Sequence, residues 1–330
     1  MCIAGIKTVL IDSGDDFFAA ACAVPLQNVT TKVLAAAGVE LLVRRDDLLD
    51  KRLSGNKFYK LFFNLHEASK KRISTLLSFG GAYSNHLHAL AAAGQRYGFR
   101  TIGVVRGERP AQLNPTLADA EKWGMQLVFI SRKEYGDKHE SQIVDALHNQ
   151  FGEFYSIPEG GANLAGAQGM QLLGRALEQQ VKADYTAVCL PCGTGTSLAG
   201  LAAGISQEKQ ALGFSCLKGD GNLGGNIAHY YRQLFSDRLL VDAPGNWRLI
   251  SGFHAGGYAK RPPDYLFRFW HAFEQETGLL LDPVYTLKMF WAIHCLAQQG
   301  YWARGSRVIA IHTGGLQGRR GFTCPEPTVI

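Results

Sequence analysis

One lysine stands where the chain can hold a charged amine at a fixed point. Lys57 follows a Gly-Asn pair in the stretch SGNKFYK and leads into the apolar run FYKLFFNL. A flexible glycine-containing loop followed at once by an apolar, helix-like segment places this ammonium near the core rather than in bulk water. Burying an ammonium is costly, so the arrangement suggests a positioned group, although it does not by itself give a function.

A second candidate site is a loop of glycine and threonine. The stretch PCGTGTSLAGLAAG, 191–204, follows an apolar run and opens a helix of small residues. Backbone N–H groups in 193–196 can converge there on an anion at the positive end of the helix. The stretch lacks the GxxxxGK[ST] pattern of a nucleotide-triphosphate loop and fits a dinucleotide fingerprint only loosely. Phosphate binding is the interpretation, and a tight turn without a ligand is the alternative.

A third candidate is the start of the segment FGGAYSNHLHAL, 79–90, where a Gly-Gly turn leads to Ser84 and Asn85. Taken alone, these two residues indicate helix capping. His86 and His88 could suggest a metal site, but residues two apart on a helix point in different directions. A single CxxC at 189–192 has no second cysteine pair, which disfavours zinc.

Alternating strand-like and helix-like segments must position these residues. The strand-like runs are VELLVRR, ISTLLSFG, TIGVVRG, MQLVFIS, FYSIPEG, YTAVCLPCG and SRVIAIHTGG, and segments such as SNHLHALAAAGQRYG and NPTLADAEKWG read as helices. This alternation predicts an α/β fold with parallel sheets covered by helices. Several strands end in Gly, Ser or Thr, at the carboxyl edge where open α/β sheets bind ligands. No repeat or long linker interrupts the pattern, so any two domains share a tight interface.

Composition excludes several classes of protein. The 330 residues are 46% hydrophobic and 19% charged, which fits a globular enzyme and excludes a disordered or fibrous chain. The formal net charge of +6 is scattered along the chain, which disfavours nucleic-acid binding and fits anionic small molecules. Seven cysteines without framework spacing, and no secretory signal, predict a cytoplasmic protein. No apolar run approaches the roughly 18 residues that span a bilayer.

Taken together and in order, these features resemble a known enzyme family. The sequence is similar to the fold-type-II pyridoxal-phosphate enzymes, and specifically to the family of D-cysteine desulfhydrase and 1-aminocyclopropane-1-carboxylate (ACC) deaminase. The motifs that carry the resemblance are VRRDDL, SGNK, SNH, IPEGGAN, GTGTSLAG, LDPVYT and HTGG. The resemblance runs from Val24 almost to the C-terminus and leaves residues 1–23 without an interpretation.

The resemblance implies an architecture and a cofactor. It predicts a fold like that of the tryptophan synthase β-subunit, with two domains that each hold a mainly parallel open sheet covered by helices. A small domain, 63–165, contributes the Ser-Asn loop, and a large domain, 1–62 with 166–330, binds pyridoxal 5'-phosphate. Lys57 would lie at the seam, where closure of the small domain could exclude water from the reaction. Relatives are usually homodimers, so a homodimer with a small amino acid as substrate is expected.

The same resemblance assigns roles to single residues. Lys57 is expected to form the Schiff base with the cofactor aldehyde and then to act as base. Asn85 is expected to bind the ring hydroxyl, and Ser84 the substrate carboxylate or a proton in transfer. The remaining expectations are that Gly193, Thr194, Gly195 and Thr196 hold the phosphate and that Tyr285 and Tyr258 face the substrate. A buried tyrosine with a satisfied hydroxyl is the alternative for each of the last two.

Two threonines bear on the reaction. ACC deaminases carry Glu after the tyrosine of the DPVY motif and Leu in the HxGG turn, where this chain has Thr286 and Thr313. A carboxylate beside the pyridine nitrogen keeps it protonated, whereas a neutral hydroxyl lets it stay unprotonated and makes the ring a shallower electron sink. The threonines therefore favour β-elimination from D-cysteine over ring opening of ACC, with Thr313 as the first choice for the partner of the ring nitrogen.

Three alternatives remain at this point. One is ACC deaminase itself, and another is a serine or threonine dehydratase-like lyase on the same fold. The third is a catalytically silent cofactor- or amino-acid-binding protein. Phe58, Tyr59 and His88 depart from the family pattern beside the substrate loops, and the silent protein is favoured if these side chains have closed the substrate site.

Overall fold

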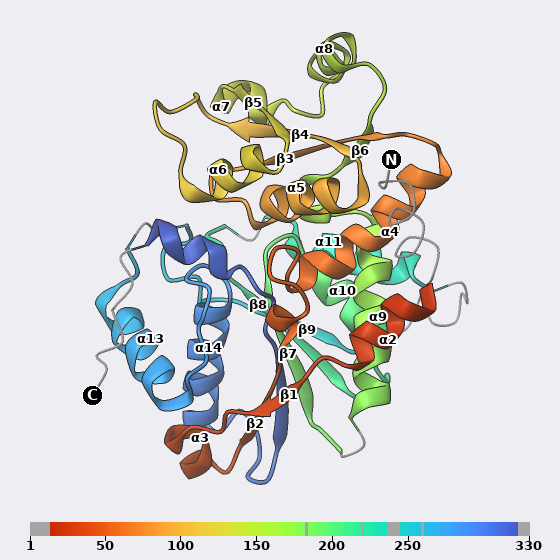
Figure 1. The fold of residues 1–330 in the computed structure, drawn as a ribbon. Helices are drawn as coiled ribbons and strands as arrows, with labels where there is room; N and C mark the ends of the chain where they lie inside the picture. Colours follow the sequence, from red (N-terminus) through yellow and green to blue (C-terminus); the bar gives the residue numbers. More distant parts are fainter. Residues whose placement is uncertain (1–13, 182–183, 220, 236–244, 259–260, 323–330) are drawn as a thin grey trace.

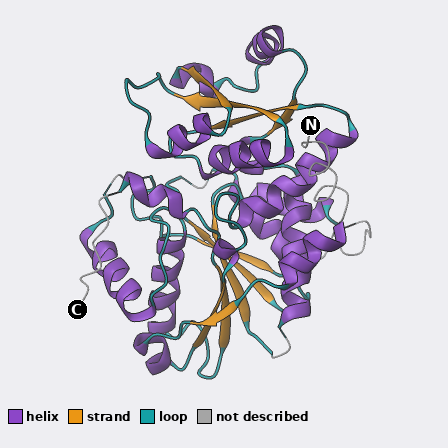
Figure 2. Ribbon diagram, viewed as in Figure 1, coloured by secondary structure: helices purple, strands orange, loops and turns teal. Residues whose placement is uncertain are grey.

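Two separate sheets organise the chain (Figure 1). The computed structural model describes residues 14–181, 184–219, 221–235, 245–258 and 261–322. All predicted site residues lie inside these ranges, whereas most of the uninterpreted N-terminal segment, residues 1–13, lies outside them. Figure 2 shows both sheets enclosed by helices.

The larger sheet has six strands in the order β1-β2-β10-β7-β8-β9. Their bounds are β1 Leu26–Asn28, β2 Glu40–Arg44, β7 Ala187–Cys192, β8 Gln210–Ser215, β9 Trp247–Ile250 and β10 Arg307–Ile311. Only β1 pairs antiparallel, at one edge, and the other strands pair in parallel. The carboxyl ends of β7 and β10, which lie side by side, therefore open on the same edge of the sheet.

The smaller sheet has four parallel strands in the order β5-β4-β3-β6. Their bounds are β3 Thr75–Gly80, β4 Arg100–Arg106, β5 Met125–Ile130 and β6 Tyr155–Ile157. These strands all fall within the predicted small domain, 63–165. The seven strand-like runs of the sequence each contain a strand, and the α/β class with mainly parallel sheets is confirmed.

Helices cover both faces of each sheet. The α-helices are α2 Gly14–Cys22, α3 Lys32–Ala37, α4 Asn56–Lys70, α5 Asn85–Tyr97, α6 Pro115–Lys122, α7 Arg132–Gly136, α8 Ser141–Phe151, α9 Leu164–Gln180, α10 Thr196–Gly204, α11 Leu223–Gln233, α13 Asp264–Thr277 and α14 Thr286–Gln298. Three 3₁₀ helices join them: η1 Asp46–Leu48, η2 Glu159–Gly161 and η3 Leu316–Gly321. One apolar cluster joins α4, α9 and α10 to α5 and α6, so it runs through both sheets, as the lack of a linker predicts.

The two cysteines of the CxxC motif lie on opposite sides of the larger sheet. Both belong to β7, but Cys189 packs in the cluster under α13 and α14, and Cys192 packs in the cluster under α9 and α10. Side chains three positions apart on a strand alternate in direction, so these thiols do not face one another. Both thiols are therefore core side chains of the larger sheet, one on each of its faces.

Three strands of the larger sheet were not among the predicted runs: β8, which lies inside the sheet, and the two edge strands β1 and β9. The sequence of β8, QALGFS, places a glycine where strands usually carry a branched or aromatic residue. The packing explains this glycine, because a Cβ on Gly213 would lie 2.6 Å from Cys192 Sγ and would overlap Leu198 of α10. Tertiary contact, rather than local strand preference, therefore requires glycine at position 213.

The N-terminal helix α2 explains why aromatic residues follow Lys57. Phe17 of α2 stacks on Phe58, with ring centroids 4.7 Å apart, and on Phe62 at 3.7 Å. Tyr59 donates its hydroxyl to Asp46 (2.6 Å) and accepts from Arg44 (3.1 Å), and all three side chains are fully buried. Phe58 and Tyr59, which depart from the family pattern, therefore pack against α2 and η1.

Candidate active site

Lys57 begins helix α4 beside the C-terminal HTGG turn. Gly55, the N-cap of α4, has a φ of +63°, and a Cβ at this position would overlap the carbonyl of Thr313. The same turn reaches the smaller sheet, because a Cβ on Gly315 would lie 2.6 Å from Asn85 Nδ2 at the start of α5. The fold thus gathers Lys57, Asn85 and Thr313 from three distant parts of the sequence.

Lys57 is also linked to the glycine-threonine loop. Its Nζ donates to Asn56 Oδ1 (3.2 Å), and Asn56 Nδ2 donates to Ser197 Oγ (3.1 Å) in the first turn of α10. Burial lowers the pKa of Lys57 to about 8, and the negative charge of Asp282 offsets part of that shift. A sizeable share of this amine is neutral near physiological pH, which a nucleophile or base requires.

The loop itself has the geometry of an anion cradle. It follows β7, and Gly195 is the N-cap of α10 with a φ of +84° and no side-chain capping bond. A Cβ on Gly195 would lie 2.7 Å from Ile227, so a larger residue does not fit. The hydroxyls of Thr194 and Thr196 lie 3.3 Å apart. The first N–H groups of a helix have no partner within the helix and favour a negative charge.

A second lysine, Lys60, lies beneath this loop and was not predicted. It is 2% exposed, and its Nζ donates to the carbonyl of Gly160 (2.9 Å). A Cβ on Gly160 would be 3.3 Å from Thr194 Cγ2, so this carbonyl lies beside the loop. Burial and the charge of Lys57 hold the pKa of Lys60 well below its ordinary value. In the printed sequence the signal was its position three residues after Lys57, on the same side of a helix.

His86 adds a third buried nitrogen group to this region. It is 2% exposed, and in the described part of the chain neither ring nitrogen has a hydrogen-bond partner. Burial and the charges of Lys57 and Lys60 hold its pKa well below the ordinary value. The buried Lys60, the half-buried Lys57, an unpartnered imidazole and an uncapped helix N-terminus form a region that a phosphate dianion would complete.

The two predicted tyrosines contact each other at the edge of the loop. Their hydroxyls are 2.8 Å apart, and a Cβ on Gly193 would lie 3.4 Å from the ring of Tyr285. Tyr258 is 62% exposed, whereas Tyr285 is only partly exposed. Burial raises the pKa of the Tyr285 hydroxyl, and a tyrosine hydroxyl ordinarily holds its proton at neutral pH, so both stay protonated. The hydroxyls satisfy each other, which leaves both predicted roles open.

Asp282 is a buried carboxylate that sequence analysis passed over within LDPVYT. It is 2% exposed, and Oδ1 accepts from the N–H groups of Val284 (3.1 Å) and Tyr285 (2.5 Å). Burial raises its pKa to about 6 against the effect of these bonds. The hydroxyl of Thr286 is engaged with the same residue, accepting from its N–H (2.7 Å) and donating to its carbonyl (3.3 Å). This leaves Thr313, which is 8% exposed, as the better candidate to meet a ring nitrogen.

Ser84 and His88 differ in their relation to the site. Ser84 caps α5 by accepting from Leu87 N–H (3.2 Å), so the capping interpretation is correct, and its own O–H is still able to donate. His88 points elsewhere: it bonds Asp119 (3.2 Å) and meets the ring of Trp123 edge to face. With Phe58 and Tyr59 packed against α2 and η1, the three residues thought able to close the site have other partners.

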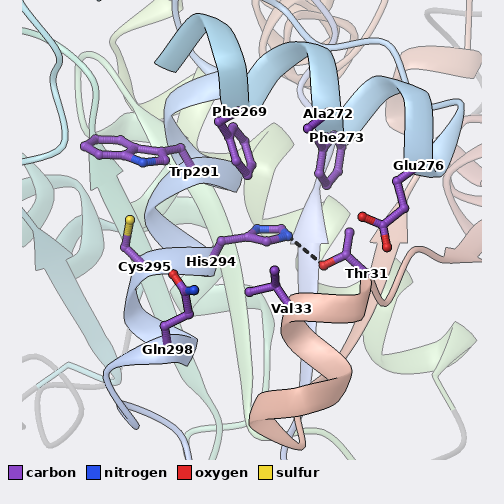
Figure 3. Close-up of a pocket in the computed structure, with 10 residues that line it drawn as sticks. All are labelled: Thr31, Val33, Phe269, Ala272, Phe273, Glu276, Trp291, His294, Cys295 and Gln298. Carbon is purple, nitrogen blue, oxygen red and sulfur yellow. Dashed lines mark hydrogen bonds between the residues drawn. The ribbon is translucent and has the colours of Figure 1, made fainter. Parts of the chain in front are cut away.

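A pocket of about 200 Å³ lies away from these residues (Figure 3). It is lined by side chains of α13 and α14 and by Thr31 and Val33, and it contains none of the predicted site residues. Its imidazole, His294, is already bonded to Thr31 (2.9 Å) and to the carbonyl of Phe290 (2.7 Å). Its imidazole is therefore already engaged, and burial raises the pKa of its free thiol, Cys295.

Comparison with known proteins decides the family. A sequence model described as pyridoxal-phosphate dependent enzyme matches residues 23–314. The chain belongs to this family. Pyridoxal phosphate is thus its cofactor, and the protein is an enzyme.

Relatives in this pyridoxal-phosphate family carry two kinds of name. A Thermotoga maritima protein, provisionally named ACC deaminase, is 31% identical, with 85% of this chain and 90% of the relative covered. An Arabidopsis thaliana protein named bifunctional D-cysteine desulfhydrase/ACC deaminase, mitochondrial, is 29% identical, with 85% and 73% covered. A crystal structure of an ACC deaminase homologue superposes with a TM-score of 0.77 at 23% identity, covering 93% of this chain and 97% of that one. The fold-type-II prediction is confirmed.

The residues gathered around Lys57 fit the group that the family requires. Lys57 would bond its aldehyde, and Lys60 adjoins the loop predicted for the phosphate. Within the described ranges, no cluster of His, Cys, Asp or Glu side chains is arranged to hold a metal ion. In the same ranges, no helix has the length and apolarity that a membrane crossing demands.

The pH dependence of cofactor capture should report the environment of Lys57. Imine formation requires the neutral amine, so the rate at which the apoprotein captures pyridoxal phosphate should rise with pH and level off above about 8. Asp282→Asn removes the charge that favours the ammonium, so the midpoint should move to lower pH. Stopped-flow absorbance measures both rates, with Lys57→Ala as the blank. A wild-type midpoint near 10, or an upward shift in Asp282→Asn, would contradict this assignment.

Lys60→Met should weaken binding of the phosphate rather than of the ring. We expect its affinity for pyridoxal phosphate to fall about 10- to 100-fold, the loss typical of a hydrogen bond to a charged group, while its affinity for pyridoxal changes little. Equilibrium absorbance titration of the apoprotein with each compound measures the two affinities. Lys70→Met, at the exposed end of the same helix, is the matched control. An equal loss for both compounds would show that Lys60 does not serve the phosphate.

Proposed function

We propose that this enzyme eliminates hydrogen sulfide from D-cysteine and releases pyruvate and ammonia. The observation that carries the proposal is the pair of threonines, Thr286 and Thr313, at positions where a carboxylate or leucine would accompany ACC opening. Asp282 does not weaken this argument. Its Oδ2 lies 2.9 Å from the point where a Gly315 Cβ would stand, next to Asn85, which places it on the predicted hydroxyl side of the ring.

Lys57 is the proposed nucleophile and base. Pyridoxal phosphate, when bound, supplies an aldehyde for amines and an electron sink for the carbanion at Cα. The lowered pKa of Lys57 provides a neutral amine at working pH, and this amine can accept the proton that leaves Cα. Asn56, bonded to both Lys57 and Ser197, holds the amine above the glycine-threonine loop.

The tyrosine pair is the proposed proton source for the leaving sulfur. The hydroxyls of Tyr258 and Tyr285 share a hydrogen bond of 2.8 Å and stay protonated at neutral pH. One can therefore donate to a thiolate while the other replaces the proton or orients the donor. Ser84, whose oxygen already accepts from Leu87, is proposed to donate its O–H to the substrate carboxylate.

The overall reaction balances without a further reactant except water. The Cα–H and Cβ–S bonds break, hydrosulfide leaves with the Cβ–S electron pair, and a Cα–Cβ double bond forms. The released aminoacrylate becomes its imine isomer, and water replaces the nitrogen to give pyruvate and ammonia. No oxidant or reductant is needed.

The domain boundaries, the oligomeric state and the cellular compartment are also part of this proposal. We place the small domain at 63–165 and propose that it closes on the substrate, that the enzyme is a homodimer and that it works in the cytoplasm. ACC is the second candidate substrate, because the Arabidopsis relative is named for both reactions. The activity assay must therefore compare D-cysteine with ACC.

Purified, cofactor-loaded enzyme should release pyruvate from D-cysteine and not from ACC. Coupled oxidation of NADH measures pyruvate, sulfide is measured in parallel, and L-cysteine and D-serine serve as controls for stereochemistry and leaving group. Lys57→Ala should lower turnover at least about 1,000-fold, as loss of a catalytic nucleophile does. Pyruvate from ACC would contradict the threonine argument, and full turnover by Lys57→Ala would contradict the assignment of the lysine.

A further inference from the structure

The side-chain amide of Asn85 is enclosed at both ends by groups that the proposed function does not use. Gln317 Nε2 donates to Asn85 Oδ1 (2.5 Å) across 232 positions of sequence. At the other end, Asn85 Nδ2 and Asp282 Oδ2 lie 2.6 and 2.9 Å from the place where a Cβ on Gly315 would stand. The oxygen of the Asn85 amide therefore accepts from Gln317, and its nitrogen lies near the carboxylate of Asp282.

The helix that carries Gln317 is fixed on two sides. Arg319 of η3 forms two bonds to the carboxylate of Glu274 (2.5 and 3.0 Å) and one to the carbonyl of Leu281 (2.8 Å). Arg320 pairs with Asp119 of α6 (2.5 Å), next to the smaller sheet. Gln317 is itself half-buried. Its amide is therefore presented to Asn85 from a firmly held backbone.

We propose that Gln317 is a positioning residue that turns the donor end of the Asn85 amide toward the ring oxygen of pyridoxal phosphate. An asparagine amide can present either a donor nitrogen or an acceptor oxygen, and the two orientations have nearly the same shape. A deprotonated ring oxygen only accepts hydrogen bonds, so the flipped amide would set two acceptors against each other. By donating to Oδ1, Gln317 selects the productive orientation. This inference rests on the proposed role of Asn85.

Substitutions that change whether residue 317 can donate a hydrogen bond test the inference directly. In Gln317→Glu the carboxylate can only accept, so it attracts Asn85 Nδ2 and turns Oδ1 toward the cofactor. Gln317→Leu removes the donor without imposing the flip. We expect affinity for pyridoxal phosphate to fall about 5- to 10-fold in Gln317→Leu and at least about 100-fold in Gln317→Glu. Absorbance titration of the apoprotein gives these affinities, and the position of the visible band of the lysine-linked cofactor should shift in the same order.

Gln126→Glu is the charge control, since Gln126 lies on β5 and bonds Arg100 on the surface. Its cofactor affinity should match that of the wild type. Gln317→Leu and Gln317→Glu with equal effects, or with none, would overturn the proposal, because a residue that only anchors η3 would not distinguish a donor from an acceptor.

A double-mutant cycle with Asn85→Ala separates this proposal from the proposed function. If Gln317 acts through Asn85, the change Gln317→Glu should have little further effect on affinity or band position in an Asn85→Ala background. Additive losses would overturn the inference while leaving the role of Asn85 intact. Wild-type affinity and spectrum in Asn85→Ala would instead contradict the role of Asn85 itself, and the inference with it.

Discussion

Burial of basic groups beside the loop 193–196 is the constraint on which this structure depends. Lys60 and His86 are almost fully buried, and the charge of Lys57 adds to burial in lowering the pKa of each. Burying such groups without a counter-charge is unfavourable, and their lowered pKa values are its direct result. A bound phosphate dianion would relieve this cost, so cofactor binding and stability of the fold are coupled.

Close helix packing brings these groups together. A Cβ on Gly169 of α9 would overlap the carbonyl of Tyr59 in α4, and a Cβ on Gly200 of α10 would overlap the carbonyl of Ala167 in α9. The missing side chains let α4, α9 and α10 approach at backbone distance. Lys57 and Lys60 on α4 are thereby held close to the loop at the start of α10. The site thus depends on small residues that carry no chemistry.

The sequence predicts those parts of the site that are encoded by short, contiguous motifs. Lys57, the loop 193–196 and the helix start at Ser84 each carry a local signature, and each lies at a strand end or helix start. Lys60 and Gln317 were missed because the bonds that define their roles reach Gly160 and Asn85, 100 or more positions away. Asp282 lies within the LDPVYT motif, but its proximity to Asn85 depends on the fold. Strand β8 escaped prediction for the same reason, since a helix packed above it dictates its glycine. The proposed choice between two substrates rests on the hydroxyls of Thr286 and Thr313. The sequence alone does not show which of them is available to the ring nitrogen, because the bonds of Thr286 to Asp282 form only in the folded chain.

Lys57, and not its buried neighbour Lys60, is the residue expected to bond the cofactor. Reduction of the loaded enzyme with borohydride fixes the cofactor to its lysine, and peptide mass spectrometry then locates the adduct. We expect a single pyridoxyl-lysine at position 57, in the peptide that contains SGNK. An adduct at position 60, or one spread over several surface lysines, would contradict it.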